Sequence, residues 1–163
     1  CLNSIIYNIY IFYNMYQNNE KSEYHLTYDK LDINTYYSYV LDPKCGAVSM
    51  FSGTTRDYFE DKEVCKLEYE AYNEMALNQF SIIEKEIREK WEVEKIILVH
   101  RLGEVEICES SVFIAISSNH RDACIKACEY AINKIKELLP IWKKEYYIDN
   151  TKTWKENKEF LIM

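Results

Sequence analysis

Apolar positions along the chain repeat with two different periods, one typical of strands and one of helices. Short runs in which apolar residues alternate with polar ones, or stand side by side, predict strands. These runs are residues 46–51, 64–72, 95–101, 111–117 and 141–148. In two longer stretches, 74–91 and 119–139, apolar residues recur mostly at three- and four-residue steps, which predicts amphipathic helices. The order of these elements indicates an α+β fold, with two main helices packed on a mainly antiparallel sheet.

Local residues indicate where several of these elements begin and end. Asn73 and Asn119 stand at the starts of the two helices, and we expect both to act as N-caps. Pro140 is expected to end the second helix, because the residue before a proline resists helical geometry. Ser52-Gly53 predicts a turn that closes the first strand, and residues 54–62 then form a polar loop.

The first 40 residues carry a weaker pattern than the rest. We expect an N-terminal extension over residues 1–40, whose order the pattern does not fix, and one domain over residues 41–163. Within the extension, residues 17–24 are predicted as a linker, 25–33 as a short strand and 34–41 as helical. Its apolar part is too short and too polar to span a membrane, which takes about 20 apolar residues.

The composition restricts the kinds of partner. The formal net charge is −7, and an acidic chain is a poor general binder of nucleic acid, because contacts to phosphate supply most of that affinity. The six cysteines form no CxxC pair, so we expect reduced thiols and a cytosolic protein. Any anion-binding role must therefore depend on a local cluster of basic side chains.

Two candidate anion sites lie at the ends of predicted strands. His120 and Arg121 open the second helix, where unpaired backbone N–H groups and the helix dipole favour a phosphate or a carboxylate. Arg56 lies in the polar loop and could present a planar fork of donors to an anion. The alternative for each is a solvated side chain beside a capped helix or in an ordinary loop.

A third candidate is a group of lysines near the C-terminal end. Lys136 falls in the last turn of the second helix, where the dipole favours any cation, and Lys143 and Lys144 follow on a strand. Since neighbouring strand residues point to opposite faces, only one of these two can share a pocket with Lys136. A lysine near other cations in a partly apolar pocket can act as acid, base or nucleophile.

Other histidines and cysteines favour structural roles. His120, Cys124 and Cys128 recur every four residues along one helix, but they span about 12 Å, too far for one metal ion. We expect Cys124 and Cys128 to be small buried residues and His100, in an apolar strand, to be a core histidine. No metal site is predicted.

From Gly46 to about Trp154 the chain resembles the large, catalytic subunit of molybdopterin synthase, and its residues are most similar to those of eukaryotic members. The matching stretches keep the same order and spacing throughout. They are GAVSMFSGTTRD at 46–57, LEYEAYNEMA at 67–76, VHRLGEV at 99–105, SSNHR at 117–121 and IKELLPIWKKE at 135–145.

The resemblance implies an alpha/beta hammerhead-like fold and a specific reaction. Members install two dithiolene sulfurs on cyclic pyranopterin monophosphate, in molybdenum cofactor biosynthesis. Sulfur arrives as a thiocarboxylate on the C-terminal Gly-Gly of a small ubiquitin-like subunit, within a heterotetramer that has a dimer of large subunits at its centre. No cofactor is needed for the transfer. The functional positions fall on Lys136 and Lys143 as catalytic residues, and on Arg56, His120, Arg121 and Phe51 as substrate-binding residues.

The spacing along the second helix adds an expectation of our own. His120 and Lys136 are sixteen residues apart, which is about 24 Å along the helix axis. One subunit cannot easily bring both to one small substrate. We therefore expect a pocket at the dimer interface, with Lys136 and Lys143 from one chain and His120 and Arg121 from the other.

Two other functions compete with sulfur transfer. A catalytically silent module could simply dock a ubiquitin-like tail, although such a module would not need Arg56 and both lysines. Nucleic-acid binding through the lysines of residues 134–158 is disfavoured by the glutamates interleaved with them, at positions 137, 145 and 156.

Overall fold

The computed structural model describes residues 16–156 of the chain. The first fifteen residues of the expected N-terminal extension, and the last seven of the C-terminal tail, lie outside the described residues. The helices and strands are β1 (Tyr16–Asn18), β2 (Ser22–Thr27), α2 (Ile33–Val40), β3 (Ala47–Thr54), β4 (Tyr58–Phe59), β5 (Lys62–Ala71), α3 (Asn73–Lys90), β6 (Ile96–Arg101), β7 (Gly103–Glu106), β8 (Ser110–Ser118), α4 (Arg121–Leu138), β9 (Ile141–Tyr147) and β10 (Lys152–Glu156).

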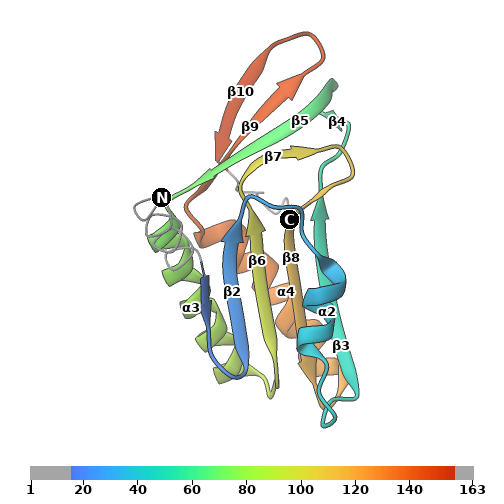
Figure 1. The fold of residues 1–163 in the computed structure, drawn as a ribbon, viewed down its shortest axis with the longest axis vertical. Coiled ribbons are helices and arrows are strands. Elements are labelled where there is room, and N and C mark those ends of the chain that lie inside the picture. The colour runs from blue at the N-terminus through green and yellow to red at the C-terminus, as the bar shows by residue number, and fades with distance from the viewer. Residues whose placement is uncertain (1–15, 157–163) are drawn as a thin grey trace, which may run out of the picture.

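These elements form two sheets, which we call the main sheet and the second sheet. The main sheet has five strands in the order β1-β2-β6-β8-β3, and all its pairs are antiparallel except β2 with β6. The second sheet has the order β10-β9-β5-β4, with β7 also paired to β5, and is antiparallel throughout. Figure 1 shows the second sheet beyond one end of the main sheet. The predicted α+β class is confirmed.

The central strands β6 and β8 are buried on both faces because helices cover both sides of the main sheet (Figure 1). Helices α3 and α4 pack on the side where Ile96 and Leu98 point, and together they form the larger apolar core. Helix α2 covers the other side, where Tyr36 and Val40 contact Ile97 and its neighbours. Burial on both faces explains why β6 and β8 are almost continuously apolar in sequence.

Residues 16–40, which the sequence assigned to an extension, contribute two strands and a helix to this fold. Strand β2 pairs in parallel with β6, and its apolar residues Tyr24 and Leu26 are part of the larger core. The strand was expected at 25–33 but spans Ser22–Thr27, so the predicted linker over 17–24 is wrong. The predicted helix over 34–41 is confirmed as α2, which is capped by the Asp32 side chain.

Both predicted asparagine caps are displaced by one residue. Tyr72 precedes α3 and His120 precedes α4 in cap position, and neither makes a capping hydrogen bond through its side chain. Asn119 instead accepts a hydrogen bond from the Gly46 N–H through its backbone carbonyl, which ties the entry of α4 to the start of β3. The predicted end of α4 before Pro140 is confirmed.

Two strands extend further than the sequence pattern suggested. Ser52-Gly53 does not turn; β3 continues to Thr54, with an irregularity in its pairing to β8 between Gly53 and Thr54. The predicted loop over 54–62 contains the short strand β4. No strand was predicted beyond residue 148, yet residues 152–156 pair with β9 as β10.

Candidate active site

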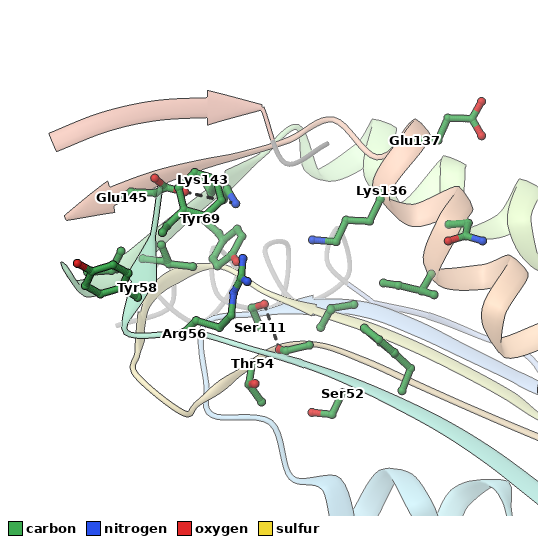
Figure 2. Close-up of a pocket in the computed structure, with 18 residues that line it drawn as sticks. Ser52, Thr54, Arg56, Tyr58, Tyr69, Ser111, Lys136, Glu137, Lys143 and Glu145 are labelled. Carbon is green, nitrogen blue, oxygen red and sulfur yellow. Dashed lines mark hydrogen bonds and ion pairs between the residues drawn. The ribbon is translucent and has the colours of Figure 1, made fainter. Parts of the chain in front are cut away.

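A cavity of about 850 Å³ lies where the main sheet, the second sheet and the C-terminal end of α4 meet (Figure 2). Its walls come from β3, β4, β5, β8, β9 and α4, so segments far apart in sequence converge there. One part is apolar, with Phe51, Val112 and Ile132 among the lining residues. The remainder is polar and carries the basic side chains considered next.

Four residues singled out in the sequence line this cavity: Phe51, Arg56, Lys136 and Lys143. Phe51 lies on β3 beside the apolar part. Figure 2 shows Arg56, Lys136 and Lys143 directed into the same space from three different elements. An acidic protein thereby concentrates positive charge in one hollow, as binding of an anionic guest requires.

The two lysines are placed by the junction between α4 and β9. Lys136 is in the last turn of the helix, and only Leu139 and Pro140 separate that helix from the strand that carries Lys143. Alternation along β9 turns Lys144 away from the cavity, where its Nζ lies 5.0 Å from the centre of the Trp154 ring. Only one of the two consecutive lysines faces the cavity, as the sequence predicted.

Arg56 is held by the backbone of the residue before it. The Thr55 N–H donates to the Glu109 carbonyl at 3.0 Å, and the Thr55 carbonyl accepts from the Cys108 N–H at 2.9 Å. The Arg56 guanidinium carbon lies 5.9 Å from the centre of the Phe59 ring on β4. The loop is therefore fixed at its base, while the arginine fork remains directed into the cavity.

Glu145 is a lining residue that the sequence analysis did not single out. Its side chain is only 2% exposed, and its two oxygens lie 3.4 Å from Lys143 Nζ and 3.2 Å from Lys155 Nζ. It also accepts a hydrogen bond from the Tyr147 hydroxyl. Burial acts to raise the pKa of Glu145, but the Tyr147 hydrogen bond and the two ammonium groups outweigh burial and hold this pKa below its ordinary value.

Tyr69 and His100 form the layer beneath the lysines. Tyr69 lines the cavity, and its ring centre is 5.0 Å from that of His100, which is 1% exposed. Burial lowers the pKa of His100 to about 4, with the charge of Lys136 adding to the effect, so the imidazole is neutral at pH 7. The expectation that His100 is a core histidine is confirmed.

His120 and Arg121 do not reach this cavity. They line a separate hollow of about 400 Å³ at the other end of α4, together with Asp122, Ile125 and Lys126. The structure of one chain therefore brings Phe51, Arg56, Lys136 and Lys143 together and leaves the His-Arg pair apart. This separation is the one that the sixteen-residue spacing along the helix predicts.

The remaining candidates have structural roles. Cys124 and Cys128 are buried in the core between α4 and the main sheet, as expected. Among residues 16–156, no three histidine, cysteine or acidic side chains gather closely enough to hold a metal ion. None of the helices in that range is long and apolar enough to cross a membrane.

Comparison with known proteins identifies the family. The family model described as MoaE protein matches residues 26–138. The molybdopterin synthase catalytic subunit of Bos taurus is 49% identical over 133 residues, covering 82% of this chain and 70% of that protein. The Homo sapiens catalytic subunit is 48% identical over 139 residues, covering 85% and 73%.

Solved structures agree with this assignment. Molybdopterin synthase from Staphylococcus aureus superposes with a TM-score of 0.76 at 37% identity, covering 80% of this chain and 94% of that one. The MoaE protein from Burkholderia ambifaria gives a TM-score of 0.72 at 26% identity, covering 87% and 92%. The chain belongs to the MoaE family, the family of the molybdopterin synthase catalytic subunits.

Proposed function

We propose that the 850 Å³ cavity is the sulfur-transfer site of this MoaE-family protein. In this proposal, sulfur passes from the C-terminal thiocarboxylate of a small ubiquitin-like subunit to cyclic pyranopterin monophosphate. One observation carries it: Arg56, Lys136 and Lys143, from three separate stretches of sequence, line a single cavity in a protein of net charge −7. Like charges repel one another, so three cations that converge in one cavity favour an anionic guest there.

The chemistry suits the residues present. Both the substrate phosphate and the thiocarboxylate are anions, so Arg56 can bind phosphate oxygens with its planar fork while the lysines orient the sulfur donor. As sulfur attacks the pterin, negative charge develops in the substrate, and nearby ammonium groups stabilise it. Lys136 or Lys143 can also pass the protons that the reaction needs. The apolar wall at Phe51 offers a surface for the pterin ring.

The dimeric arrangement follows from the position of the His-Arg pair. His120 and Arg121 would complete the phosphate site from a second copy of the chain, since within one chain they lie at the opposite end of α4. The assembly proposed is a central dimer of this chain with one small subunit bound to each copy. A cytosolic location is also proposed, because the five cysteines within residues 16–156 are free thiols.

The principal test is the reaction itself. Thiocarboxylated small subunit and cyclic pyranopterin monophosphate are mixed with wild-type protein or with Lys136→Ala, and molybdopterin formation is followed. We expect the variant to be slower by about 100-fold or more, because general acid–base and charge-stabilising groups contribute on this scale. Lys90→Ala is the matched control: Lys90 also lies in the last turn of a helix, α3, where its Nζ is 5.6 Å from the centre of the Tyr130 ring. Neither Lys90 nor Tyr130 lines the cavity, so this variant should keep nearly the full rate.

Two outcomes would contradict the proposal. Wild-type protein that binds the thiocarboxylated subunit but forms no molybdopterin would be the silent docking module instead. Equal rates for wild type and Lys136→Ala would show that the reaction does not take place in this cavity.

A further inference from the structure

Behind the cavity, a second lysine approaches the same buried carboxylate as Lys143. Lys155 lies on β10, directly opposite Lys143 of β9 in the strand pairing. Its Nζ is 3.2 Å from one oxygen of Glu145, while Lys143 Nζ is 3.4 Å from the other. One carboxylate with 2% of its side chain exposed therefore serves two ammonium groups.

Lys155 has further partners that fix its position. Its Nζ lies 3.9 Å from the centre of the Phe59 ring and 3.3 Å from a Glu60 carboxylate oxygen. Lys143 approaches the same ring less closely, at 5.3 Å. Lys155 thus connects the C-terminal strand to the β4 turn and to Glu145, yet it is not among the residues that line the cavity.

The sharing of Glu145 has a consequence for Lys143. A single carboxylate in a poorly solvated place binds a lone ammonium strongly, and charge interactions there exceed those at the surface. With Lys155 on its other oxygen, part of the negative charge of Glu145 is already offset, although Lys155 also pairs with Glu60. Lys143 then shares Glu145 with a second ammonium group, and it also faces the positive charges of Arg56 and Lys136 within the same cavity.

We propose that Lys155 is a positioning residue for the sulfur-transfer site: it offsets part of the charge of Glu145 from outside the cavity, so that Glu145 holds Lys143 less strongly and Lys143 is available to the anionic guest. The inference rests on the proposed function to the extent that Lys143 acts on that guest. Lys155 itself touches neither substrate nor sulfur donor; it acts through Glu145.

The first experiment measures the chemical reactivity of Lys143, which needs no assumption about catalysis. The full-length chain is treated with a limiting amount of an amine-acylating reagent, and modification of Lys143 is followed by peptide mass spectrometry. Only an unprotonated amine reacts. In Lys155→Met, Lys143 is the sole ammonium beside Glu145 and should react about three- to tenfold more slowly, because a poorly solvated carboxylate that is no longer shared holds it more strongly.

The controls separate this effect from general disturbance. Lys126, exposed at the far end of α4, is the internal reference in every sample. Lys152→Met removes a lysine from the same strand on its other face, over the Tyr146 ring, and should leave Lys143 unchanged. Lys155→Arg keeps the charge and should restore the reactivity. If Lys155→Met perturbs folding, Lys155→Gln takes its place and should show the same slower acylation of Lys143.

A double-variant cycle tests the route through Glu145. In a Glu145→Gln background there is no charge to compete for, so Lys155→Met should change Lys143 reactivity by less than about twofold. An effect of the same size in both backgrounds would overturn the proposal. So would unchanged or faster acylation of Lys143 in Lys155→Met alone.

The second experiment measures turnover in the assembled enzyme. Lys155→Met should lower kcat about tenfold while KM for the cyclic pterin stays within about twofold, because Lys155 does not contact that substrate. A raised KM with unchanged kcat would contradict the inference. If wild type forms no molybdopterin, the proposed function fails, whereas the acylation result still decides the role of Lys155.

Discussion

His100 makes the stability of the protein dependent on pH. Burial lowers the pKa of this residue to about 4 in the folded chain, whereas an exposed histidine titrates near pH 6.5. Between these pH values, His100 binds a proton in the unfolded chain but not in the folded chain. Stability is therefore complete above about pH 6.5 and falls as the pH drops towards 4. His25, whose pKa burial also lowers to about 4, contributes in the same direction.

Replacing His100 should flatten this dependence. Wild-type protein is expected to lose about 2 kcal/mol of unfolding free energy from His100 alone between pH 7 and pH 5. His100→Gln should lose correspondingly less over that interval, as measured by urea denaturation at both pH values. His120→Gln, which changes an exposed histidine, should follow wild type. A His100 variant with the full wild-type pH dependence would refute the argument.

Individual site residues differ in how far the sequence could reveal them. Arg56, Lys136 and Lys143 were candidates from the local pattern, where each also fits a solvated side chain, and the family resemblance favoured them over that alternative. Glu145 could have been found from alternation, because it stands two residues after Lys143 on the same face of β9. Lys155 could not, since its place depends on the pairing of β10 with β9, which no local pattern encodes.

At the scale of elements, Gly53 determines how β3 passes beneath the cavity. A Cβ atom added at this position would lie 2.6 Å from Val112 Cγ1, a stiff and buried side chain on the neighbouring strand β8. The close approach coincides with the irregular pairing between Gly53 and Thr54. Glycine therefore serves here to bring two strands together just before the loop that carries Arg56.

Gly53→Ala should separate these strands. We expect a loss of about 1–3 kcal/mol in unfolding free energy, typical of overpacking, together with reduced turnover because the base of the Arg56 loop shifts. Urea denaturation and the molybdopterin assay measure the two effects. Ser52→Ala is the control at the preceding residue. It removes only an exposed hydrogen bond to Ser110, so its unfolding free energy should stay within about 0.5 kcal/mol of wild type. Comparable stability of the two variants would show that the close approach is unimportant.

The same glycine explains why the sequence misled at this point. Ser52-Gly53 is a strong turn signal, yet the pair lies inside a strand because Gly53 is required by packing against Val112 rather than by chain reversal. The two main helices and strands β3, β5, β6, β8 and β9 were predicted to within a few residues, since their apolar periods reflect burial directly, whereas the shorter strands β1, β4, β7 and β10 were not predicted. The predicted caps were each misplaced by one residue: Asn73 is already inside α3, and Asn119 lies one residue before the cap position of α4.

At the scale of the whole molecule, α4 separates two groups of cations. Its eighteen residues span about 27 Å, with Lys136 at one end and His120 and Arg121 at the other. If the proposed dimer joins these ends across an interface, each pocket combines lysines from one copy with the His-Arg pair from its partner. This shared pocket can be tested by mixing chains that carry substitutions in different groups.

Chains carrying Lys136→Ala and chains carrying His120→Ala should each be inactive or impaired alone. Mixed in equal amounts and reassembled at random, half the dimers contain one of each, and one of their two pockets is intact. About a quarter of wild-type activity should return. Mixing Lys136→Ala with Lys143→Ala should restore nothing, because both lysines come from one copy. If the first mixture recovers no activity above that of either parent, the pocket is not shared between two copies of the chain.

The fold class was predictable, but its division into two sheets was not. Long-range pairing decides which strands share a sheet. The local sequence therefore did not indicate that β7, which lies between β6 and β8 in the chain, pairs with β5 in the second sheet. The parallel alignment of β2 with β6 was equally hidden, and residues 16–40 therefore seemed separable from the domain.

The alternation of β9 makes the site unusually sensitive to changes in chain length. Inserting or deleting one residue between Pro140 and Lys143 would shift the strand by a single pleat and exchange its faces. A deletion would put Lys144 and Tyr146 where Lys143 and Glu145 now lie, and an insertion would put Trp142 and Lys144 there, so neither change would leave Lys143 and Glu145 facing the cavity. Natural variation in this short stretch should therefore consist of substitutions, and length should be the property that selection holds constant.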